Sequence, residues 1–244
     1  AHEAGRAHLE EVLGERVTVQ RFVGVGNGEE AETAMETAIK NGADIIFATT
    51  APLIAACRKT AARYPETKIF NCSVAMPYTD VRTYYSRIYE GKFISGAIAG
   101  AISKSDDIGY IASYPIFGVP AGINAFALGA QLTNPDAKIH LKWSCVNGQP
   151  LAELRELGVE VVSTLDIPMP GWSGGQWGTF RMQPDGSTHL LASPYWDWGT
   201  FYVQLARNIL GSGWDGTTHD RQGVPTWPYQ LPPAFHTVYH WTPV

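Results

Sequence analysis

The chain has 244 residues, of which 45% are apolar and 17% are charged, and its formal net charge is −5. This length is enough for one large domain or for two lobes of about 100–150 residues each, and the composition is that of an ordinary globular protein. No large cluster of Lys and Arg occurs, which argues against a nucleic-acid-binding surface, and no apolar run approaches the roughly 20 residues of a membrane-spanning helix.

Helical and strand patterns alternate along most of the chain. Residues 1–13 have helical periodicity, residues 17–23 are typical of a strand, and Asn27 with Glu30 predicts a capped helix that ends at Asn41. Further strands are predicted at 43–48, 68–74, 108–113, 138–145 and 159–165, and helices at 52–64, 89–103, 120–132 and 151–157. The repeat of about 25–30 residues predicts βαβ units and mostly parallel sheets, an α/β fold.

The second part of the chain follows a different pattern. Residues 166–188 are rich in Pro and Gly, strands are predicted at 176–182 and 189–193, a helix at 198–210, and the remaining tail has little periodicity. In the earlier helix 89–103, Gly96 and Gly100 lie four residues apart, on one face of the helix. We expect this face to pack closely against a neighbouring helix.

Several motifs resemble catalytic or cofactor sites only in part. Gly171, Ser173 and Gly175 have the spacing of a nucleophile elbow, but prolines precede them and a strand rather than a helix is predicted after them. A serine hydrolase that uses Ser173 is therefore an alternative, and a surface loop is the preferred interpretation. The glycines at 24–28 lack the dinucleotide-binding spacing, and neither His2 with His8 nor the three cysteines have metal-ligand spacing, so no cofactor or metal is predicted.

An aromatic run, Tyr195-Trp196-Asp197-Trp198, lies where a predicted strand meets a predicted helix. In open α/β sheets ligands bind beyond the carboxyl ends of the strands. The candidate ligand-binding residues are those at or just beyond the carboxyl ends of predicted strands, namely Thr50, Ser73, Tyr114, Asp166, Trp196 and Trp198. Indole rings for stacking, hydroxyls and one carboxylate suit a neutral polar ligand with an aromatic ring.

Seven short stretches together resemble the basic membrane lipoprotein family, the substrate-binding proteins of ATP-binding-cassette transporters. They are residues 1–6 (AHEAGR), 44–49 (DIIFAT), 89–96 (YEGKFISG), 108–110 (IGY), 122–126 (GINAF), 134–137 (NPDA) and 193–199 (SPYWDWG). The resemblance implies a type I periplasmic-binding fold of two doubly wound parallel-sheet lobes, of which the first strand is expected to be missing here. It implies lobes at 1–112 plus 194–225 and at 113–193 plus 226–244.

By the same resemblance the protein captures a purine nucleobase or nucleoside between its lobes for uptake and is not an enzyme. Asp166 would accept hydrogen bonds from the ligand, and Trp196 and Trp198 would stack on or wall its ring. Nucleoside-binding relatives tend to have a lysine near the position of Trp196, so a free base is favoured. A permease partner and an extracytoplasmic, lipid-anchored location are implied. The alternative is a ligand-sensing regulatory domain of the same fold, which would be cytoplasmic.

Overall fold

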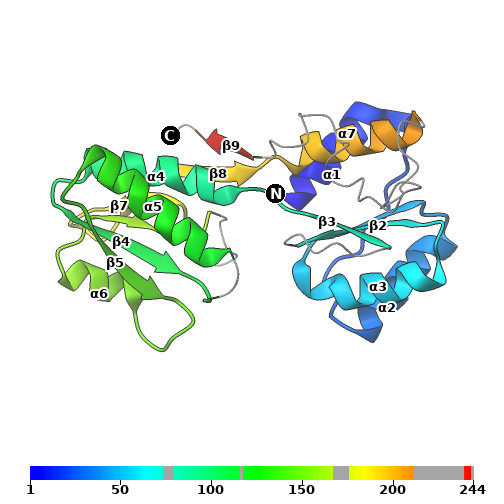
Figure 1. The fold of residues 1–244 in the computed structure, drawn as a ribbon, viewed down its shortest axis with the longest axis horizontal. Helices are drawn as coiled ribbons and strands as arrows, with labels where there is room; N and C mark the ends of the chain where they lie inside the picture. Colours follow the sequence, from blue (N-terminus) through cyan, green and yellow to red (C-terminus); the bar gives the residue numbers. More distant parts are fainter. Residues whose placement is uncertain (74–79, 116–117, 167–175, 212–238, 243–244) are drawn as a thin grey trace, which may run out of the picture. The chain divides into compact units, whose positions relative to one another are not determined.

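The computed structural model describes residues 1–73, 80–115, 118–166, 176–211 and 239–242 (Figure 1). The chain forms two compact units, unit 1 (Ala1–Ser86 and Asp197–Val238) and unit 2 (Arg87–Trp196 and Tyr239–Val244). These units differ from the predicted lobes at three places: residues 87–112 and 194–196 are grouped with unit 2, and residues 226–238 with unit 1. The helix within 87–112 packs along another helix of unit 2. The exact lobe boundaries therefore stay a prediction.

Unit 1 is built on a parallel sheet with the strand order β1-β2-β3, formed by β1 (Ile45–Ala48), β2 (Lys68–Cys72) and β3 (Val81–Tyr84). Two helices, α2 (Glu29–Lys40) and α3 (Ile54–Arg63), pack on one face of the sheet through a core that includes Met35, Cys57 and Ile69. Successive residues of a strand point to opposite faces, so Phe47 and Phe70 lie on the other face. Burial raises the pKa of both Cys57 and Cys72 to about 12, so these thiols are packing residues.

The second face of this sheet is covered by aromatic rings from α1 (His2–Leu13) and α7 (Trp198–Leu210), which pack on each other. The Trp198 ring meets Tyr84 edge to face with 5.2 Å between centroids, and it stacks on His2 at 5.1 Å. The His2 Nδ1 atom lies 2.7 Å from the Tyr202 hydroxyl, which lies 3.0 Å from the Tyr84 hydroxyl. These rings form an aromatic core that holds the two helices on the sheet.

The burial of His2 makes the stability of unit 1 sensitive to acid. Burial lowers the pKa of His2 from 6.5 to about 4, so the neutral ring is favoured in the folded state. The stabilisation of the folded state by the neutral His2 ring is complete above about pH 6.5 and is lost as the pH falls toward 4. From pH 7 to pH 4.5 we expect the unaltered chain to lose on the order of 1–3 kcal/mol more stability than a His2→Phe variant.

Urea titrations at the two pH values measure this difference directly. His8→Gln, a change in the exposed histidine of the same helix, should keep the acid sensitivity of the unaltered chain. Equal losses of stability in the unaltered chain and the His2→Phe variant would contradict the assignment of the acid sensitivity to His2.

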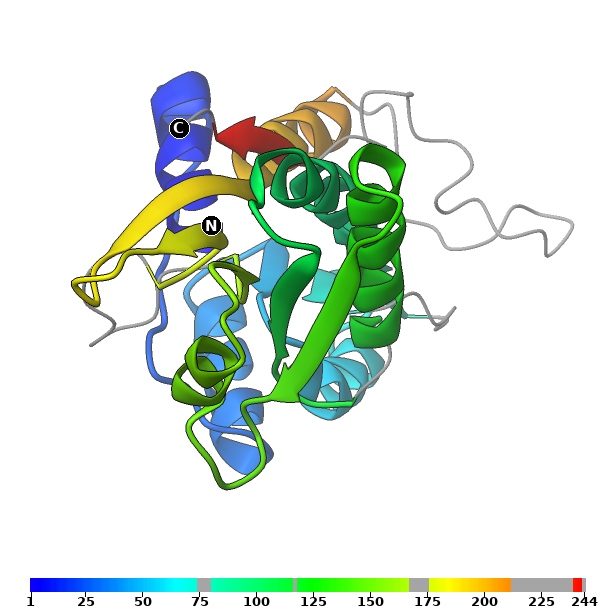
Figure 2. The ribbon, with the colours of Figure 1, turned by 90° about the vertical axis from the view of Figure 1, so that its left-hand side faces the viewer.

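Unit 2 is built on a mixed sheet with the strand order β5-β4-β6-β7-β8-β9. The strands are β4 (Asp107–Ala112), β5 (Lys138–Trp143), β6 (Val161–Ser163), β7 (Thr179–Met182), β8 (Thr188–Trp196) and β9 (Tyr239–Thr242). Strands β4, β5 and β6 are parallel to one another. Strand β7 is antiparallel to β6, β8 is antiparallel to β7, and β9 is antiparallel to β8. One face carries α4 (Ile88–Ile102) and α5 (Val119–Thr133), and the other carries α6 (Pro150–Glu156), as Figure 2 shows. The parallel, doubly wound arrangement predicted from the sequence is confirmed for β4, β5 and β6, and the antiparallel strands extend it.

Helices α4 and α5 lie side by side at backbone contact distance. A Cβ atom at Gly96 would lie 2.0 Å from the Phe126 carbonyl oxygen, and one at Gly100 would lie 2.4 Å from that of Ala130. The predicted close packing of these two glycines is thereby confirmed. From the α5 side, a Cβ at Gly129 would lie 1.9 Å from the carbonyl oxygen of Phe93.

Some local predictions were wrong. Residues 17–23 form no strand and pair with none of the described strands of unit 1, and Val23 is 72% exposed. Helix α2 begins after Gly28 without a side-chain cap, so Asn27 is not its cap. Two strands, β3 and β9, have too little hydrophobic alternation to be predicted. Among the described residues, no helix combines the length and apolar character needed to cross a membrane.

Candidate functional site

The carboxyl edge of the unit 2 sheet gathers three of the predicted ligand-binding residues. Tyr114 follows β4, Asp166 follows β6, and Trp196 ends β8. Strands β4 and β6 are parallel, and β8 runs in the same direction as β6 because β7, antiparallel to both, lies between them. The topology therefore brings the three residues to one edge, although they are far apart in the sequence.

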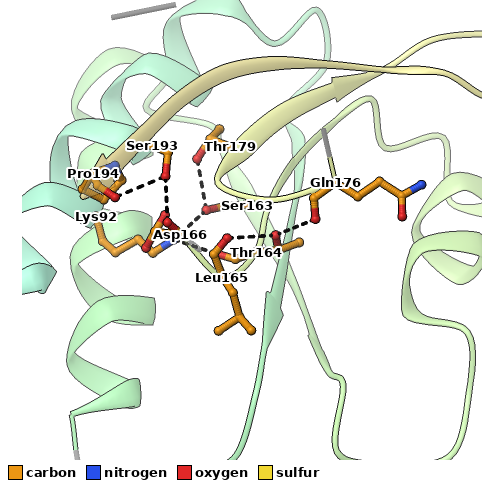
Figure 3. Close-up of polar contacts among 9 residues, drawn as sticks. All are labelled: Lys92, Ser163, Thr164, Leu165, Asp166, Gln176, Thr179, Ser193 and Pro194. Atoms are coloured by element: carbon orange, nitrogen blue, oxygen red, sulfur yellow. Dashed lines mark hydrogen bonds and ion pairs between the residues drawn. The ribbon is translucent and has the colours of Figure 1, made fainter. Parts of the chain in front are cut away.

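Asp166 is buried at this edge in an ion pair with Lys92 from α4 (Figure 3). The Lys92 Nζ atom lies 2.8 Å from Asp166 Oδ1, and the two side chains are only 6% and 4% exposed. The same ammonium group donates to the Thr164 carbonyl oxygen at 2.7 Å and to the Ser163 hydroxyl at 3.2 Å. A buried charge is tolerated when it is paired and hydrogen-bonded in this way.

Hydroxyl groups from three strands surround the pair. Thr179 of β7 donates to the Ser163 hydroxyl of β6 at 3.0 Å, and Ser193 of β8 donates to the Asp166 carbonyl oxygen at 3.4 Å. Both serines and Thr179 are fully buried. These side chains join α4, β6, β7 and β8 in one polar network, drawn in Figure 3.

The electrostatics of the network favour a charged pair. Burial alone lowers the pKa of Lys92, but the neighbouring Asp166 charge and the hydrogen bond to it raise that pKa above its ordinary value. Burial raises the pKa of Asp166, and the Lys92 charge opposes this rise. The Lys92 ammonium also lies 5.4 Å from the centre of the buried Tyr110 ring, which adds a cation–π contact. When both groups are ionised, the pair of Lys92 and Asp166 carries no net charge.

The two aromatic candidates in unit 2 have different environments. Tyr114 is 61% exposed, so its ring is open to solvent. Trp196 is partly buried, and its indole Nε1 atom is buried without a hydrogen-bond partner among the described residues. A buried indole N–H normally has an acceptor, so this donor is available to an acceptor that the described chain does not supply.

In unit 1 the structure brings together Thr50 and Ser73 but not Trp198. Thr50 and Ser73 each lie two residues beyond the paired Ala48 and Asn71, at the carboxyl edge of adjacent strands. Asn71 ties this edge by donating to the Thr50 carbonyl oxygen at 2.9 Å. Trp198 is only 2% exposed, and its ring packs in the aromatic core, so the expectation that it walls a ligand is corrected. Asp197 caps α7 by accepting from the Thr200 N–H.

Lys92 is the residue that sequence reasoning missed. It stands in the middle of the YEGKFISG stretch, where its position in a largely apolar helix is the one signal of a buried charge. The Ser173 motif lies outside the described residues. The described residues hold no group of three or more His, Cys, Asp or Glu side chains placed to bind a metal ion.

The sequence of the chain is similar to one family model and to two named proteins. The model of a family described as "ABC transporter substrate-binding protein PnrA-like" matches residues 4–145, more than half of the chain. A purine-binding protein of Brucella abortus is 29% identical over 87% of this chain and 65% of its own length. A Haloferax volcanii protein, whose name gives it as a glucose-binding protein of an ABC transporter, is 28% identical over 76% of this chain and 51% of its own length. The chain thus spans less than two thirds of either relative.

Solved structures share the fold at low sequence identity. A solute-binding protein of an ABC transporter system from Conexibacter woesei superimposes with a TM-score of 0.68 at 14% identity, covering 89% of this chain and 78% of its own. A transcriptional activator of the comK gene from Bacillus halodurans gives 0.67 at 16% identity, covering 86% and 78%. At these identities the likeness establishes the fold alone.

Proposed function

Because the chain belongs to the family of PnrA-like ABC transporter substrate-binding proteins, we propose that it binds a purine nucleobase or nucleoside for uptake. The observation that carries the purine proposal is the 29% identity, over 87% of this chain, with a protein named for purine binding. As a proposal for the whole protein, the ligand is passed to a membrane permease from a lipid-anchored position outside the cytoplasm.

The carboxyl edge of the unit 2 sheet supports a purine ligand chemically. The Asp166 carboxylate is an acceptor for ring or exocyclic N–H groups. If the Trp196 ring stacks on the purine, its indole N–H points past the rim of that purine and can donate to another acceptor. A purine carries N–H groups at its rim and a flat face on which an indole can stack. The exposed Tyr114 ring and, in unit 1, the Thr50 and Ser73 hydroxyls are further proposed contacts.

Calorimetry with adenine, guanosine and glucose tests this function. We expect the two purines to bind and glucose to leave the heat signal at its baseline. A purine at 100 times its Kd should add about 2.7 kcal/mol of stability, visible as a rise in Tm. Tight binding of glucose with no purine binding would instead favour the chemistry for which the Haloferax volcanii relative is named.

Replacing Trp196 by leucine should weaken purine binding by about 10–100-fold, because stacking of a base on an aromatic ring contributes about 1–3 kcal/mol. The matched control is Tyr195→Leu, since consecutive strand residues point to opposite faces of the sheet and Tyr195 is 43% exposed. The control should bind within about twofold of the unaltered chain. Equal losses in the two variants would show that Trp196 has no special contact with the ligand.

A further inference from the structure

Lys92 is a buried lysine, and the proposed function has not yet given it a role. An ammonium group has three donors, and the Lys92 Nζ atom has three acceptors, namely Asp166 Oδ1, the Thr164 carbonyl oxygen and the Ser163 hydroxyl. Its donors are therefore satisfied within the protein, and Lys92 is not placed to bind a ligand itself. What it does is hold the carboxylate of Asp166.

Asp166 keeps acceptor capacity after this pairing. An ionised carboxylate accepts about four hydrogen bonds, and the bond from Lys92 uses one of these positions on Oδ1. A hydrogen bond from the Ser193 side chain also favours the ionised form of Asp166. A protonated carboxyl group would instead act as a donor through its O–H. Which partners Asp166 can accept thus depends on its ionisation, and its burial works against the ionised form.

We propose that Lys92 is a positioning residue that keeps the Asp166 carboxylate ionised and fixed in direction, so that the sheet edge selects neutral ligands with N–H donors. The inference rests on the proposed function and adds the reason for its specificity. A buried carboxylate alone would attract a cation, whereas the Lys92–Asp166 pair has no net charge and leaves only hydrogen-bond acceptance. A neutral purine with an amino or imino N–H meets this requirement, and a ligand that presents only acceptors does not.

Calorimetry with adenine and guanosine at pH 6 and pH 8 tests the role of Lys92. Removing the ammonium in Lys92→Met takes away the charge that opposes protonation of Asp166, so ionisation of Asp166 should move into this pH range. The variant should then bind about tenfold more weakly at pH 6 than at pH 8, a tenfold change corresponding to one unit of pKa. A packing defect alone would weaken binding equally at both pH values.

Two further variants serve as controls for Lys92→Met. Lys142→Met breaks a surface ion pair with Glu153 in the same unit, and it should bind as the unaltered chain does, within about twofold at both pH values. Asp166→Asn removes the carboxylate and should bind weakly at both. Binding by Lys92→Met that is weakened without any dependence on pH would overturn the proposal.

A ligand-free measurement keeps the proposal testable if Lys92→Met does not fold. In the unaltered chain, carbon-13 NMR of labelled Asp carboxyl groups, assigned by comparison with Asp166→Asn, should show Asp166 ionised from pH 6 to pH 8. A protonated Asp166 in this range would overturn the proposal. If the unaltered chain binds neither purine, the proposed function fails, and the titration still decides whether Lys92 lies beside an ionised Asp166.

Discussion

Replacing Gly129 by alanine should lower the free energy of unfolding of unit 2 by about 3 kcal/mol or more, at the upper end of overpacking effects. The added Cβ would lie 1.9 Å from the Phe93 carbonyl oxygen and 2.9 Å from the Ala97 backbone nitrogen. Both neighbours are helix backbone, which cannot turn away as a flexible side chain can. Helices α4 and α5 would have to move apart, and contacts along their whole shared length would weaken.

Gly122→Ala is the matched control for this prediction, because Gly122 lies in the same helix. There an added Cβ would meet the Tyr110 hydroxyl at 3.5 Å and a Lys92 side-chain carbon at 3.7 Å, which are ordinary contacts. Alanine restricts the unfolded chain more than glycine, so this variant should gain about 0.4–1 kcal/mol. Urea titration of the three chains, with hydrogen exchange of β4 and β6 to report on unit 2, measures both effects. Similar stabilities for the two variants would contradict the close contact of the helices.

The glycine pair of α4 illustrates what could be predicted from the sequence. Small residues four positions apart on an apolar helix are typical of close packing against another helix. Gly96 and Gly100 therefore predicted this packing from the sequence alone. Helix α7 was predicted with the bounds that the structure has, because its periodicity and its Asp197 cap are local signals. The strand predicted at 17–23 is not formed, because a strand needs a neighbouring strand to pair with. The local sequence pattern carries no information on whether such a neighbour exists.

The candidate site was harder to predict for the same reason. Asp166 could be proposed because it follows a strand, but its partner Lys92 lies 74 positions earlier in the chain and on a helix. Nothing in the spacing of the sequence links these two residues. Trp198 was misassigned because an aromatic residue at a strand-to-helix junction has the same local pattern whether it faces a ligand or the core. Only the packing of His2 and Tyr84 against its ring distinguishes the two.

The largest effect on stability from a single charge should come from Lys92→Met, which should cost about 3–5 kcal/mol at neutral pH. The substitution leaves the Asp166 carboxylate buried without its partner, and the loss reflects this stranded charge more than the attraction of the pair. Lys142→Met removes one partner of a surface pair in which the side chains are 32% and 42% exposed, so it should cost less than about 1 kcal/mol.

The pH dependence of this loss identifies its cause. Without Lys92, the pKa of Asp166 in the folded state should lie well above its value in the unfolded chain, because burial opposes ionisation. A carboxyl group of this kind costs no stability at low pH and destabilises the protein increasingly as the pH rises through the folded pKa. The stability gap between the unaltered chain and Lys92→Met should therefore be wider at pH 8 than at pH 5.

A double-mutant cycle separates the charge of Lys92 from its packing. Lys92→Met with Asp166→Leu removes both charges, and an apolar pair of this kind often restores stability to that of the original ion pair or above it. Urea titrations of the four chains at pH 5 and pH 8 give the coupling energy, which should exceed about 2 kcal/mol at pH 8 and shrink at pH 5. A double variant as unstable as Lys92→Met would mean that the lysine stabilises α4 through its packing and not through Asp166. Recovery would show that the stability of the fold does not require the ion pair.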